Sequence, residues 1–186
     1  MPTTQVQTAP AIQTGSQTYA RSIVQQLLRE HRRWRSKDFP WIAHLFDEVQ
    51  SAEDGQPACL APLRNAFYRL CAEMEGHMSR EEHILFPAIL EAQNEPDAAP
   101  KGFGSIRNPI AMIEQEHDWE AERLEKMREI ARDYQLPHNA DEKLRLLFRE
   151  LEALEAAMHA HTHLEGSILF ARALAAEGQH SAERPT

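Results

Sequence analysis

Apolar residues recur along the chain with the three-and-four spacing of amphipathic helices. Four segments follow this pattern and predict helices over about residues 19–49, 62–92, 108–134 and 141–176. Pro40 interrupts the first segment and predicts a kink there. No segment shows a sustained strand-like alternation of apolar and polar residues. The pattern therefore predicts an all-α fold, an up-down-up-down four-helix bundle with short connections.

Each apolar stripe is broken by a histidine at a position that faces the centre of the predicted bundle. Two of the stripes also carry a glutamate four residues after the histidine. A histidine at i and a glutamate at i+4 lie on one helix face, one turn apart. We therefore expect six polar side chains to meet inside the bundle, namely His31, His77, Glu81, His117, His161 and Glu165.

A buried carboxylate or imidazole without a partner costs several kcal/mol, and coordination of cations removes much of that cost. Carboxylates can bridge two metal ions, and imidazoles suit iron, zinc, copper and nickel. A mixed histidine and carboxylate set without thiolates, inside a helix bundle, is typical of di-iron sites, whereas structural zinc more often uses cysteine. The pattern thus predicts two non-haem iron ions, joined by carboxylate or oxo bridges.

The bulk properties narrow the class of protein. The chain has 186 residues, and polar ends predict disordered tails over 1–18 and 177–186 around one domain, 19–176. A net charge of −9 argues against broad binding to nucleic acid or to an anionic membrane. The chain shows neither a membrane-spanning apolar run nor the pattern of a signal peptide. The chain has only two cysteines, too few for a disulfide framework. These features together predict a cytoplasmic protein with reduced thiols.

Three segments carry a family resemblance: HMSREEHILFPAI at 77–89, NPIAMIEQEHDWEAERL at 108–124 and HTHLEGSILFARAL at 161–174. They resemble the hemerythrin-like (HHE) cation-binding family, and within it the di-iron proteins linked to repair of iron–sulfur centres. The resemblance covers about 19–176, but the polar segment before it does not resemble the Cys-bearing N-terminal domain of the repair proteins. It implies bridging carboxylates from Glu81 and Glu165, and terminal imidazoles from His31, His77, His117 and His161.

One further ligand is expected from the resemblance, because the repair proteins have a fifth histidine near the end of the first helix. This chain reads Gln-Ser-Ala-Glu at 50–53. Glu53 follows His31 by about 22 residues, which returns to nearly the same helix face, so Glu53 is the leading candidate. The alternatives for this position are His83, Asp38 and water. Glu114 or Glu116 is a candidate outer partner that would orient a ligand.

The resemblance implies a protein that binds or reacts with NO, O₂ or reactive oxygen, in a nitrosative or oxidative stress response or in repair of damaged iron–sulfur proteins. Two alternatives stay open: a module that stores, carries or senses O₂, and a bundle with a purely structural metal. Oxygen-carrying hemerythrins have a second histidine on the third helix, where this chain has Ile113 and Ala121, so carriage is disfavoured. Whether the centre makes the protein an enzyme is left open.

Overall fold

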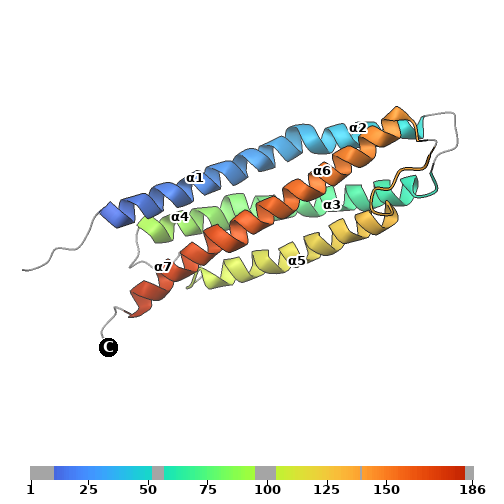
Figure 1. The fold of residues 1–186 in the computed structure, drawn as a ribbon. Helices are drawn as coiled ribbons and strands as arrows, with labels where there is room; N and C mark the ends of the chain where they lie inside the picture. The colour runs from blue at the N-terminus through green and yellow to red at the C-terminus, as the bar shows by residue number, and fades with distance from the viewer. Residues whose placement is uncertain (1–10, 52–56, 95–103, 139, 183–186) are drawn as a thin grey trace, which may run out of the picture.

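The computed structural model describes residues 11–51, 57–94, 104–138 and 140–182, and these residues form helices without any strand. Four long rods run side by side (Figure 1). The first rod is α1 (Ala11–Arg33), the π turn η1 (Trp34–Asp38) and α2 (Phe39–Gln50); the second is α3 (Leu60–Arg80), the π turn η2 (Glu81–Leu85) and α4 (Phe86–Asn94). The third is α5 (Arg107–Ile130), and the fourth is α6 (Glu142–Leu164), the π turn η3 (Glu165–Phe170) and α7 (Ala171–Ala182). The predicted all-α four-helix bundle is confirmed.

The rods differ from the prediction mainly at their ends. Helix α1 begins at Ala11, eight residues before the expected start at 19, and α7 continues to Ala182 instead of 176. The sequence places Pro10 directly before α1, and proline is compatible with a helix start. The first and last residues of the predicted tails, 1–10 and 183–186, lie outside the described part of the chain, so the predicted division into tails and one domain stays a prediction.

Helix α5 is shorter than predicted, ending at Ile130 instead of about Tyr134. Arg132, Asp133 and Tyr134 have φ angles of 52°, 54° and 54°, and left-handed residues do not continue a right-handed helix. Helix α6 begins after Asp141, whose side chain accepts a hydrogen bond from the backbone N–H of Leu144 at 2.7 Å. Among the described helices, none is long and apolar enough to cross a membrane.

The apolar core consists of two clusters rather than one continuous stripe. The first packs α2 against α3, the end of α5 and α6 as far as Met158, around Phe46 and Phe67. The second packs α1 against α4, the start of α5 and α7, around Leu27, Phe86 and Phe170. Each rod therefore has apolar core residues above and below a middle section, and this section carries the polar residues that interrupt the predicted stripes.

Candidate metal centre

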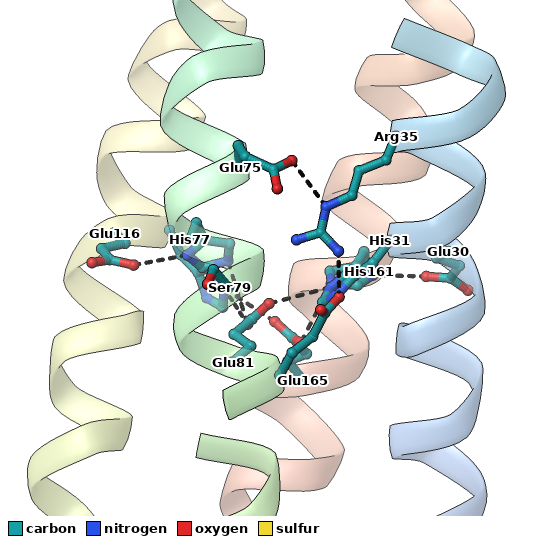
Figure 2. A network of polar contacts seen from close by, with 12 residues as sticks. Glu30, His31, Arg35, Glu75, His77, Ser79, Glu81, Glu116, His161 and Glu165 are labelled. Carbon is teal, nitrogen blue, oxygen red and sulfur yellow. Dashed lines mark hydrogen bonds and ion pairs between the residues drawn. The ribbon is translucent and has the colours of Figure 1, made fainter. Parts of the chain in front are cut away.

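The six predicted inward residues meet in this middle section. His31 comes from α1, His77 from α3, His117 from α5 and His161 from α6, while Glu81 and Glu165 are the first residues of η2 and η3. All six are buried; His31, Glu81 and Glu165 have no exposed surface. Figure 2 shows the two glutamates between His77 on one side and His31 with His161 on the other.

The six side chains form two groups that share both glutamates. In each group one ligand atom per residue lies within 4.8 Å of the others. The groups are His31, Glu81, His161 and Glu165, and His77, Glu81, His117 and Glu165. Two imidazoles and two carboxylates thus surround each of two neighbouring positions, and each carboxylate belongs to both. Imidazole and carboxylate ligands without thiolate suit first-row transition metals.

Unsatisfied polar atoms support a bound cation. Within the described residues, six buried side-chain atoms of this cluster lack a hydrogen-bond partner: Nε2 of His77 and His117, and both carboxylate oxygens of Glu81 and Glu165. Native proteins rarely bury such atoms without a partner, because each costs about 1–3 kcal/mol. All six face the shared centre, where a cation would satisfy them together, so the residues fit a metal.

Close contacts between the rings and the carboxylates shift their pKa values in opposite directions. Nε2 of His31 and of His77 lie 3.2 and 3.3 Å from Glu81. Burial opposes ionisation of Glu81, but these imidazoles outweigh burial and hold its pKa below the usual range. Burial likewise opposes charge on His77, yet Glu81 and Glu116 raise its pKa to about 9. Without a metal, therefore, the charged forms of the ring and of the carboxylate favour each other.

The same balance applies on the other side of the centre. Nε2 of His161 lies 3.4 Å from Glu165. Burial opposes charge on His161, but Glu165 and Glu30 raise its pKa to about 10. Metal binding at this centre would have to displace these protons, as it does at other sites where the ligand must be deprotonated.

Three histidines are held from behind by carboxylates. Their Nδ1–H groups donate to Glu82 Oε1 at 2.9 Å from His31, to Glu116 Oε2 at 2.9 Å from His77, and to Glu30 Oε2 at 2.7 Å from His161. A carboxylate only accepts, so each contact places a proton on Nδ1 and turns Nε2 towards the centre. Carboxylates behind ligating histidines fix the ring orientation in metal sites.

Arginines anchor two of these outer carboxylates. Arg35 donates to Glu82 at 2.6 Å and to Glu75 at 2.9 Å. Figure 2 shows the contact between Arg35 and Glu75. Arg80 lies 2.7 Å from Glu116. Of the two predicted outer partners, the structure therefore selects Glu116, whereas Glu114 is exposed. Sequence reasoning missed Glu30 and Glu82, because both lie beside the apolar stripe and not on it.

Two candidates for a fifth, non-bridging ligand, Asp38 and His83, are not brought to the centre. Glu53 lies outside the described residues. Asp38 forms an ion pair with Arg33 at 2.9 Å, and His83 is exposed, with its ring against the backbone oxygen of Ser79 at 2.8 Å. Asp38 and His83 are thus engaged elsewhere.

A seventh polar residue, Glu120, occupies an inward position that sequence reasoning overlooked. It is 8% exposed and continues the stripe of α5 from Ile113 and His117 to Leu124, with steps of four, three and four residues. That regular spacing was the signal that could have found it. Burial raises the pKa of Glu120 to about 7, although the nearby His77 and His117 favour its charged form.

Comparisons with known proteins found a matching family model and several relatives. The family model for the hemerythrin HHE cation binding domain matches residues 22–173. An iron-sulfur cluster repair protein YtfE from Yersinia pseudotuberculosis serotype IB (strain PB1/+) is 29% identical over 150 residues, which cover 80% of this chain and 63% of that protein. The YtfE protein of Dickeya chrysanthemi (strain Ech1591) is 29% identical over 156 residues, or 83% and 66%. The chain thus spans just under two thirds of the length of these relatives.

Proposed function

Since this chain belongs to the hemerythrin HHE cation-binding domain family, we propose that it is a non-haem di-iron protein that binds or reacts with NO, O₂ or reactive oxygen species. We place it in a cytoplasmic response to nitrosative or oxidative stress, with damaged iron–sulfur proteins as its partners. The relatives named for iron–sulfur cluster repair support this role.

The observation that carries the proposal is the sharing of Glu81 and Glu165 between two groups of imidazoles. A single ion would need only one such group, whereas two carboxylates common to both groups suit bridges between two ions. Each group offers four ligand atoms, fewer than the six of octahedral coordination, so iron bound there keeps positions for a diatomic ligand.

The protein supplies orientation and a fixed charge. Glu30, Glu82 and Glu116 keep three imidazoles aligned, and their negative charge raises the basicity of the rings. The two apolar clusters above and below restrict access of water along the bundle axis. An environment with little water has a low dielectric constant, which strengthens the electrostatic interactions at the centre.

Metal analysis of freshly purified protein tests the proposal. We expect two irons per chain in wild type and a loss of at least half of the iron in His77→Ala and in Glu165→Ala. The control His83→Ala removes an exposed histidine six residues after His77 and should keep full iron. Unchanged iron in both site variants would overturn the site. Zinc in place of iron would favour the structural alternative.

Anaerobic exposure of the reduced protein separates the remaining functions. Rapid oxidation by O₂ together with tight NO binding supports a reactive centre. Reversible oxygenation would instead support a module that stores or senses O₂, an alternative that Ile113 and Ala121 disfavour because neither side chain can ligate a metal.

A further inference from the structure

A pocket between α3 and α5 lies beside the candidate centre, against His77. It has a volume of about 250 Å³, and its wall includes His77, Glu116, Glu120 and Trp119. One water takes about 30 Å³ of liquid, so the pocket has room for a small ligand with several waters. Because His77 belongs to only one of the two ligand groups, the pocket serves the His77/His117 position rather than the His31/His161 position.

Glu120 differs from the other charged groups of this pocket. Glu116 contacts His77 and Arg80, and Glu73 pairs with Arg123 at the rim. Glu120 has no hydrogen bond or ion pair within the described residues, although only 8% of its surface is exposed. A carboxyl that lines the pocket and has no protein partner can form a hydrogen bond with a polar ligand bound there.

Glu120 does not belong to either group of candidate metal ligands. It is absent from both groups of ligand atoms that approach within 4.8 Å of one another, although His117 lies only three residues before it on α5. A carboxyl that lines the pocket without joining the ligand set is suited to contact a molecule bound at the metal, not the metal itself.

A second pocket, between α1 and α6, provides the comparison. It measures about 180 Å³ and is lined by Glu30, Arg33 and His161 among others. Its charged groups are engaged, since Glu30 accepts from His161 and from Gln26, and Arg33 pairs with Asp38. Of the two pockets, only the one between α3 and α5 is lined by a mostly buried carboxyl, that of Glu120, without a hydrogen bond or ion pair among the described residues.

We propose that the α3–α5 pocket is the binding site for the exogenous small ligand at the His77/His117 position, and that Glu120 hydrogen-bonds this ligand from the pocket wall. This inference rests on the proposed function, because the ligand needs a metal at that position. Glu120 accordingly determines ligand affinity while leaving the metal in place.

Azide is the probe for the test, because it is small, binds open iron positions and changes their visible absorption. We compare azide dissociation constants and iron content for iron-loaded wild type, Glu120→Gln and Glu120→Leu, with the exposed Glu122→Leu as the control on the same helix. Leucine at a buried position is compatible with folding. Azide only accepts hydrogen bonds, so Glu120 contacts it as the protonated acid, with the carboxyl O–H as the donor. The amide N–H of glutamine also donates, so Glu120→Gln stays within about twofold of wild type, while Glu120→Leu binds azide about tenfold more weakly.

The outcomes separate the two proposals. Full iron with unchanged azide affinity in Glu120→Leu would overturn the inference alone. Loss of iron in Glu120→Leu would also overturn it, by making Glu120 a metal ligand. Weaker azide binding in Ala157→Phe, which fills the α1–α6 pocket, would place the ligand on the opposite side. Wild type without iron would overturn the proposed function and this inference together.

Discussion

Replacing Glu82 tests whether the carboxylates behind the histidines control the centre. Glu82 Oε1 accepts from His31 Nδ1 at 2.9 Å and from Arg35 at 2.6 Å. Burial raises the pKa of Glu82, but these two partners outweigh it and hold the pKa below its usual range. Glu82→Leu therefore removes a charged acceptor and leaves a fully buried imidazole N–H without a partner.

The size of the effect follows from these contacts. An unsatisfied buried donor costs about 1–3 kcal/mol of stability. In a chain of this length each kcal/mol lowers Tm by about 2–4 °C, so metal-free Glu82→Leu should melt about 2–12 °C below metal-free wild type. Loss of a carboxylate behind a ligating histidine weakens metal binding by about 10–100-fold, which corresponds to about 1.4–2.7 kcal/mol.

Glu75→Leu is the matched control, because Glu75 is the next link of the same chain. It contacts Arg35 at 2.9 Å but is 62% exposed and does not touch His31. Exposed ion pairs contribute little, so its stability should change by no more than about 0.5 kcal/mol. Competition with a coloured chelator measures affinity, and urea unfolding measures stability. Equal effects of Glu82→Leu and Glu75→Leu, or wild-type metal affinity in Glu82→Leu, would refute this role.

Three further predictions follow from metal release, from pH and from thiol burial. Removal of metal by EDTA should lower Tm, by about 5–11 °C relative to protein held at about 100 times Kd of free metal, and a metal-free chain that melts no lower would contradict the internal site. In the metal-free protein the pKa values of His77 and His161 are raised from 6.5 to about 9 and about 10. The stability that these protons provide is complete below about pH 6.5 and is lost as pH rises through these values, so urea midpoints measured across that range should fall; midpoints that rise would reverse the sign. Burial raises the pKa of Cys71 to about 12, so iodoacetamide at about pH 8 should leave Cys71 unmodified in the folded protein and modify it in urea, as mass spectrometry would show.

The six inward residues could be predicted because each breaks an apolar stripe. A polar residue at a core position is informative by itself, and His77 with Glu81 or His161 with Glu165 repeats the signal one turn later. The bundle then brings the four stripes together, so that no knowledge of loop geometry is needed. For the same reason Glu120 was predictable from its place on the stripe of α5.

The outer carboxylates could not be found in this way. Glu30 and Glu82 lie next to a stripe, where a half-buried charge on a helix is ordinary. Their partners are 131 and 51 residues distant in sequence, and they come into contact only through the relative rotation of neighbouring rods. Local periodicity determines which face of each helix is buried. It does not determine the exact rotation of each helix about its own axis, and that rotation decides whether Glu82 contacts His31.

The spacing of buried residues also explains why a π turn begins at Glu81 and at Glu165. In α6 the buried positions advance by alternating three and four residues as far as His161, and then by four residues at each step, to Glu165, Leu169 and Ala173. The second rod makes the same change at His77.

Repeated steps of four rotate an α-helical stripe by about 40° each time, which would carry Glu165 and the residues after it away from the core. A π turn takes in an additional residue and restores the facing direction. Helix α5 keeps the alternating spacing through His117 and Glu120 and has no π turn. The local helix geometry at Glu81 and Glu165 therefore follows from the same sequence feature that places both carboxylates at the centre.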